Sequence, residues 1–74
     1  MPLIHYLNLS GYNCPIPQIE TKKALGNIAY GDLLQITVTN PICYNAILEL
    51  VPRLGYNILS NIKNGNSFII TIRK

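Results

Sequence analysis

Cys14 is the residue best placed in this chain to do covalent chemistry, because it begins the tetrapeptide Cys14-Pro15-Ile16-Pro17. Proline has no backbone N–H and fits only the first turn of a helix, so two prolines one residue apart fix where a helix begins. A cysteine just before that point lies near the positive end of the helix, which favours the thiolate over the thiol. We interpret Cys14 as a reactive sulfur, supported by Pro15, by Pro17 and by Gly11 in the preceding turn.

The remaining candidate groups do not complete another kind of site. Thioredoxin-type chemistry needs a second cysteine at position 17, which is occupied by Pro17. A closed zinc site needs about four ligands, and two distant cysteines with the single histidine, His5, do not supply them. The sequence has no glycine-rich phosphate loop and no acidic cluster. We therefore expect neither a metal nor a cofactor, and we interpret His5, on an apolar strand face, as structural.

Cys43 follows Asn40-Pro41, a second proline-marked helix start, so it too is expected near a helix N-terminus. Crossover loops of adjacent parallel strands open on the same edge of a sheet, which makes a relay or a disulfide between Cys14 and Cys43 one interpretation. The interpretation that we favour is a small apolar packing residue. Tyr12, two residues before Cys14, is interpreted either as part of a rim that limits access of water or as a packing residue.

Length and composition indicate one small globular domain, residues 1–74. Of its residues 49% are hydrophobic and only 12% are charged. No apolar run approaches the roughly 18 residues of a membrane span, the first residues do not resemble a signal peptide, and two cysteines are too few for a disulfide framework. We expect a cytoplasmic protein that does not bind membranes. The net charge of +3 reflects few acids rather than a dense basic stripe, so direct nucleic-acid binding is not expected.

Hydrophobic periodicity predicts six elements. Alternation predicts strands over Leu3 to Leu9, with Leu3, Leu7 and Leu9 on one face, and over Leu33 to Thr39, with Leu34, Ile36 and Val38 on one face. A helix from about Pro17 to Ile28 separates them. After Asn40, an apolar stripe predicts a second helix, which Pro52 should kink or loosen before Gly55 ends it. The stripe comprises Ile42, Ala46, Ile47, Leu50, Val51 and Leu54.

The last two strands are predicted over Ile58 to Ile62 and Ser67 to Arg73, joined by a turn over Lys63 to Asn66 that contains an Asn-Gly pair. Two strand-helix-strand crossovers of right-handed sense place both helices on one face of the sheet. The predicted fold is an α/β (α+β) two-layer sandwich of order β-α-β-α-β-β, in which two helices cover one face of a four-stranded mixed sheet.

The Cys-Pro-x-Pro motif, the Lys22-Lys23-Ala24-Leu25 segment after it and the Leu7 to Gly11 segment before it resemble the TusA/SirA family of small sulfur-carrier proteins. The resemblance continues along almost the whole chain, through Gly31-Asp32, Asn40-Pro41, Gly55 and the terminal Ile72-Arg73-Lys74. It implies the fold reached above and a role for Cys14 as the carrier of sulfane sulfur in a persulfide. Such carriers act in tRNA thiolation and other sulfur relays.

The chain departs from the family at several polar positions. Asn8 stands where the family usually has an acidic residue, and Ser10 where it often has an arginine. Thr39, Asn40 and Ala46 replace acidic residues before and within the second helix. Because these are expected surface positions, the departures bear on the choice of partners more than on the chemistry of the cysteine.

The resemblance implies a persulfide-relay sulfurtransferase. A thiolate at Cys14 would attack the outer sulfur of a donor's persulfide and pass that sulfur to an acceptor protein. A cysteine desulfurase or a rhodanese is the implied donor, and Lys22 and Lys23 are candidates for docking a partner. The alternative is a non-catalytic module that binds RNA or a regulatory protein and keeps the motif for structural reasons.

Overall fold

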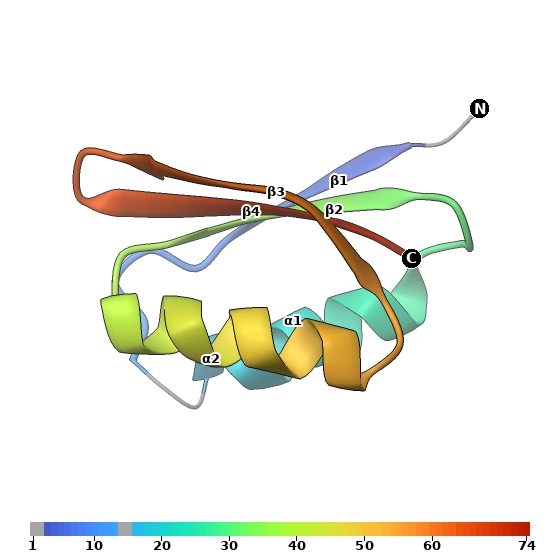
Figure 1. Cartoon of the computed structure of the whole chain (residues 1–74), viewed down its shortest axis with the longest axis horizontal. Coiled ribbons are helices and arrows are strands. Elements are labelled where there is room, and N and C mark those ends of the chain that lie inside the picture. Colours follow the sequence, from blue (N-terminus) through green and yellow to red (C-terminus); the bar gives the residue numbers. More distant parts are fainter. Residues whose placement is uncertain (1–2, 14–15) are drawn as a thin grey trace.

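The computed structural model of the chain describes residues 3–13 and 16–74. Its elements follow the predicted order, and two helices lie below a four-stranded sheet (Figure 1). The elements are β1 (Ile4–Asn8), α1 (Ile16–Asn27), β2 (Leu33–Val38), α2 (Pro41–Arg53), β3 (Asn57–Asn64) and β4 (Ser67–Arg73).

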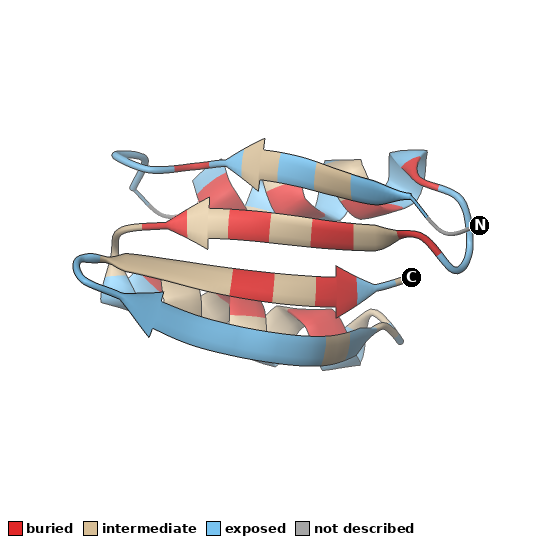
Figure 2. Cartoon of the chain, turned by 90° about the horizontal axis from the view of Figure 1, so that it is seen from above, coloured by how far each residue is buried: buried red, intermediate tan, exposed pale blue. Residues whose placement is uncertain are grey.

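The sheet has the strand order β1-β2-β4-β3. β1 pairs in parallel with β2, and the other two pairings are antiparallel, so the sheet is mixed as predicted. Both helices lie behind the sheet when it is viewed from its uncovered face, with β1 and β3 as the two edges (Figure 2). The fold thus confirms the two-layer sandwich.

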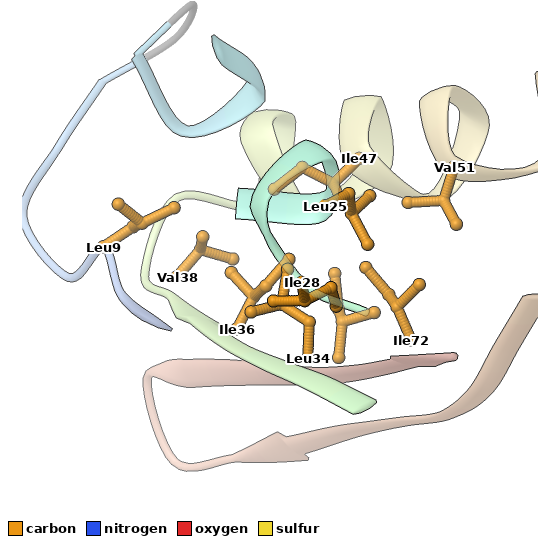
Figure 3. Packing of buried hydrophobic residues seen from close by; sticks show 10 residues of the cluster. Leu9, Leu25, Ile28, Leu34, Ile36, Val38, Ile47, Val51 and Ile72 are labelled. Carbon is orange, nitrogen blue, oxygen red and sulfur yellow. The ribbon is translucent and has the colours of Figure 1, made fainter. Parts of the chain in front are cut away.

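The core lies between the sheet and the helices. Leu34, Ile36 and Val38 of β2 alternate with half-exposed residues and are buried, as predicted. Across the antiparallel ladder, Leu34 is paired with Ile72 and Ile36 with Ile70, so four apolar side chains form the floor of the core. Leu25, Ile47 and Val51 pack onto this floor from the helices (Figure 3).

α2 begins as the sequence predicts, but one residue of its stripe was assigned wrongly. Asn40 is the N-cap, and its side-chain oxygen accepts a hydrogen bond from the Ile42 backbone N–H at 2.8 Å. Ile42 is 72% exposed, whereas Cys43 is fully buried with Ile47 and Val51. Because successive helical residues are rotated by about 100°, the i, i+4, i+8 series that starts at Cys43 faces the core and Ile42 does not.

The helix continues through Pro52 to Arg53. Two hydrogen bonds then close its end, from the Gly55 N–H to the Pro52 carbonyl and from the Tyr56 N–H to the Val51 carbonyl. Gly55 has φ +89°, a left-handed conformation that glycine adopts without strain. The predicted end at Gly55 is therefore confirmed.

The β3–β4 hairpin is longer than predicted. Asn64 pairs with Ser67, so the loop consists of Gly65 and Asn66 alone. Gly65 has φ +62°, and a glycine at the first central position is the requirement of a type II′ turn. An irregularity between Ile58 and Ser60 shifts the register of β3, which simple alternation did not reveal.

Candidate functional site

Cys14 and Pro15 lie outside the described residues, so the frame of the site is formed by their neighbours. Both helices begin at the same end of the molecule, where the parallel strands β1 and β2 end (Figure 1). The Ile16 backbone N–H, at the start of α1, donates to the Asn13 carbonyl at 3.1 Å. The two residues that flank the Cys14-Pro15 dipeptide are therefore hydrogen-bonded to each other at the N-terminus of α1.

The segment between β1 and Asn13 is fixed to the end of β2. The Leu9 N–H donates to the Thr37 carbonyl at 2.8 Å, and the Gly11 N–H donates to Thr39 Oγ1 at 3.0 Å. Gly11 has φ +83°, a value that a residue with a side chain adopts only with strain. The role predicted for Gly11 in the turn before the cysteine thus has a structural basis, although its contribution to function stays a prediction.

Three of the polar departures from the family pattern make hydrogen bonds around this site. Asn8 Oδ1 accepts from the Ser10 backbone N–H at 3.0 Å, closing a small turn after β1. Thr39 holds Gly11, and Asn40 caps α2. The N-cap at Asn40 was predicted, whereas the internal roles of Asn8 and Thr39 were not, although Asn and Thr beside turns could have indicated them.

Pro17 forms part of the buried first turn of α1. Its carbonyl accepts a hydrogen bond of 2.7 Å from the buried hydroxyl of Thr21. Neither helix has an acidic residue in its first turn. No carboxylate of either first turn therefore opposes an anion at the positive helix ends.

Lys22 and Lys23, the predicted docking residues, are both exposed on α1. Lys23 Nζ lies 4.0 Å from a carboxylate oxygen of Glu20, and both side chains are largely solvated. Such an exposed pair contributes little to stability. The two lysines are accessible to a partner, and their docking role stays a prediction.

A pocket of about 340 Å³ lies between the end of β1 and the start of α1. The described residues of its lining lie before and after Cys14 in the sequence; most are apolar, and Glu20 is the one among them that carries a charge. Tyr12 is half-exposed and lines this pocket, so it belongs to the rim of a hollow rather than to the core. The lining residues are Leu7, Asn8, Leu9, Tyr12, Ile16 and Glu20.

Cys43 is fully buried in the first turn of α2, as the packing interpretation predicts. It is also disulfide-bonded, which that interpretation did not include. A disulfide sulfur is neither nucleophilic nor ionisable, so any thiol chemistry at this position requires prior reduction.

His5 lies away from this end of the molecule and has a structural partner. Its Nε2 is 3.0 Å from Asp32 Oδ2, and the Leu3 backbone N–H donates to Asp32 Oδ1 at 3.2 Å. The His5 hydrogen bond, followed by the one from Leu3, lowers the pKa of Asp32 from its ordinary value of 3.8. The carboxylate ties the start of β1 to the start of β2 and was not singled out from the sequence.

Within residues 3–13 and 16–74, no group of three or more His, Cys, Asp and Glu side chains is arranged to hold a metal ion. In the same part of the chain, no helix has the length and apolar character needed to cross a membrane.

The fold and the Cys14-Pro15-Ile16-Pro17 sequence define a class of protein: small two-layer sandwiches that carry a Cys-Pro-x-Pro motif between the first strand and the first helix. Residues 5–74 match the family model described as "Sulfurtransferase TusA". The chain belongs to the TusA family.

Known relatives agree with this assignment. A putative sulfur carrier protein of Thermotoga maritima is 38% identical over 53 residues, which cover 72% of this chain and 67% of the relative. A sulfur carrier protein TusA of Pseudomonas putida is 31% identical over 68 residues, which cover 92% of this chain and 85% of the relative. The crystal structure of a SirA-like protein from Desulfitobacterium hafniense superposes with a TM-score of 0.83 at 28% identity and covers 95% of each chain.

Proposed function

We propose that this chain is a sulfur carrier that holds sulfane sulfur as a persulfide on Cys14 and relays it to an acceptor protein. The observation that carries the proposal is the common end at which both helices begin, without a carboxylate in either first turn, beside the residues that flank Cys14. The names of the relatives support the same role. Residues 1–74 form the carrier as one cytoplasmic domain.

The proposed cycle uses one sulfur atom of the chain. The Cys14 thiolate attacks the outer sulfur of a donor's persulfide, the bond between the two donor sulfurs breaks, and the donor cysteine leaves as a thiolate. The persulfide on Cys14 is also an anion near neutral pH, so the helix end that favours the thiolate favours the loaded form. An acceptor cysteine then removes the outer sulfur by the same reaction.

The residues around Cys14 have separate roles in this proposal. Pro15 and Pro17 set the start of α1, and Gly11 allows the turn that brings the chain to it. Lys22 and Lys23 offer exposed positive charge to an acidic surface of a cysteine desulfurase, a rhodanese or an acceptor.

Intact-mass measurement tests the proposal. The reduced chain is incubated with a cysteine desulfurase and cysteine, or with thiosulfate or polysulfide. We expect a gain of the mass of one sulfur atom, which a thiol reductant reverses and which Cys14→Ala abolishes. If the chain gains no sulfur from any donor and Cys14 alkylates no faster than a model thiol, the carrier role fails. RNA retention that survives Cys14→Ala and weakens with salt would then favour the binding-module alternative.

A further inference from the structure

The two edges of the sheet differ in their protection. An exposed edge strand offers unpaired N–H and C=O groups, and proteins usually block such edges with bulges, lysines or prolines. β3 has both a register irregularity between Ile58 and Ser60 and an exposed lysine, Lys63. β1, with the sequence Ile-His-Tyr-Leu-Asn, has no lysine, no proline and a continuous register with β2. The β1 edge is therefore open to another strand.

The hydrogen bonds at the two ends of the β1–β2 ladder show which groups point to this open edge. The Leu33 N–H donates to the Leu3 carbonyl, and the Leu9 N–H donates to the Thr37 carbonyl. In a parallel pair the backbone groups of alternate residues point to the same neighbour. The odd-numbered residues of β1 therefore face β2, and the backbone N–H and C=O groups of Ile4, Tyr6 and Asn8 face outward.

The pocket of about 340 Å³ lies on the helix side of the same strand. A strand added beside β1 would direct alternate side chains toward the helix layer, where Leu7, Leu9 and Ile16 offer an apolar lining. Among the described residues that line the pocket, Glu20 is the one that carries a charge, and its contact with Lys23 is loose at 4.0 Å. A partner side chain that enters here should be apolar, with a lysine or arginine next to it for Glu20.

We propose that the β1 edge and this pocket form the docking site for an extended segment of the protein that donates sulfur to Cys14. The segment adds a strand to the sheet at Tyr6, places an apolar side chain in the pocket and pairs a basic residue with Glu20. Main-chain hydrogen bonds supply affinity in this mode, and side-chain pockets supply selectivity. The inference rests on the proposed function, because it names the partner of that site.

The position of the pocket supports a donor in particular. Tyr12 and Ile16, which line it, lie two residues before and two residues after Cys14. Sulfur transfer requires the two reacting sulfur atoms to touch, so the donor must bring its cysteine to the part of the chain between Asn13 and Ile16. An extended segment aligned along β1 reaches the pocket that Tyr12 and Ile16 line.

The sharpest variant is Tyr6→Pro. It removes an N–H that points outward and leaves the ladder to β2 intact, which is the position where an edge strand tolerates proline. Tyr6 is 74% exposed, so its ring contributes little to packing, and Tyr6→Val separates loss of the ring from loss of the N–H. Glu20→Lys reverses the charge at the pocket, with Glu20→Gln as its neutral control.

Loading is measured by intact mass with two sources of sulfur: polysulfide, and a persulfide-bearing protein donor. The protein donor is the more effective of a cysteine desulfurase with cysteine and a rhodanese with thiosulfate. We expect Tyr6→Pro to lower the ratio of protein-driven to polysulfide-driven loading about fivefold to tenfold relative to Tyr6→Val, through KM. Glu20→Lys should lower the same ratio more than Glu20→Gln.

Other outcomes overturn the inference. Equal ratios for Tyr6→Pro and Tyr6→Val would exclude docking at this edge, as would loading by polysulfide but by neither protein donor. Sedimentation that shows a dimer of the parent chain, dissociated by Tyr6→Pro, would assign the edge to a second copy. If circular dichroism shows that Tyr6→Pro is unfolded, the comparison of Glu20→Lys with Glu20→Gln tests the inference, and equal loading ratios for these two variants would overturn it. Failure of polysulfide to load the parent chain is a different result, because it removes the proposed function itself.

Discussion

Asp32 joins the starts of β1 and β2 to the end of β4. Its carboxylate accepts from the Leu3 backbone and contacts His5, and its backbone carbonyl accepts from the Lys74 N–H at 3.0 Å. These bonds hold the start of β1 and the end of β4 against the start of β2. These bonds lie at the end of the sheet opposite to the start of α1. We therefore expect substitutions that remove them to affect stability rather than sulfur loading.

The lowered pKa of Asp32 predicts an acid-sensitive contribution to stability. A carboxyl group whose pKa is lower in the folded than in the unfolded state stabilises the fold fully above its unfolded value, about 3.8. That contribution is lost as the pH falls through the lower, folded pKa. We expect the urea midpoint of the parent chain to fall more steeply below pH 4 than that of Asp32→Asn. Parallel midpoints for the two chains across this range would contradict the prediction.

Thr39 stabilises the segment after β1, because its hydroxyl oxygen accepts a hydrogen bond from the Gly11 backbone N–H. Thr39→Val keeps the shape of the side chain but removes the acceptor for the Gly11 N–H, and we expect a loss of about 1 kcal/mol in the free energy of unfolding. Thr39→Ser is the matched control because it retains the hydroxyl. Denaturant titration of both variants tests this, and equal losses would show that the methyl group rather than the hydrogen bond matters.

The sequence located the candidate site through Cys14 and its prolines because their backbone restrictions are local. It could not show that Thr39 reaches Gly11 or that Asp32 reaches His5, since these pairs are 28 and 27 residues apart. Their contacts depend on the register between β1 and β2, which is set by the packing of both strands against the helices.

At the scale of the elements, α2 allows a test of the N-cap. Asn40→Ala removes the acceptor for the Ile42 N–H, and we expect it to lower the free energy of unfolding by about 1 kcal/mol. Asn40→Asp preserves the cap and adds a negative charge at the positive helix end, so it should be at least as stable as the parent. Thermal unfolding followed by circular dichroism distinguishes the two, and a destabilised Asn40→Asp would contradict the assignment.

The elements themselves were largely predictable, and the errors have local causes. The apolar stripe of α2 was predicted to start at Ile42, but helical geometry gives that position to Cys43, whose packing role was predicted separately. Leu3 was expected on the inner face and is 62% exposed, because β1 begins only at Ile4. The hairpin turn was displaced by one residue because both Asn-Gly and Gly-Asn suit a two-residue loop.

β2 is the central element, and its core side chains should be the most sensitive to truncation. Ile36 is fully buried at the middle of the strand. We expect Ile36→Ala to lower the free energy of unfolding by about 2 to 5 kcal/mol and Ile36→Val by about 1 kcal/mol. The total free energy of unfolding of a 74-residue chain is roughly 4 to 11 kcal/mol, so the loss expected for Ile36→Ala is a large part of it. A loss below 1 kcal/mol for Ile36→Ala in denaturant titration would place Ile36 outside the core.

At the scale of the whole molecule, Cys43 relates the redox state of the chain to the proposed chemistry. Because Cys43 is disulfide-bonded, we expect its thiol to be alkylated only after treatment with a dithiol. After reduction, Cys43→Ala should load Cys14 as well as the parent does, since the proposed transfer uses one cysteine. Intact mass measures both, and a large loss of loading in reduced Cys43→Ala would support a relay between the two cysteines.

The order of the strands also bears on folding kinetics. β3 and β4 are joined by a two-residue loop, whereas β1 pairs with a strand 29 residues away and is held in the sheet on one side only. Closing long loops is slow, so the hairpin should form before β1 docks onto β2. In the native state the same strand should be the first to open, and its amides should exchange with deuterium faster than those of β2 and β4. Partial opening of the molecule would then separate β1 from β2, and with it disturb the pocket that β1 lines, before it disturbs the hairpin.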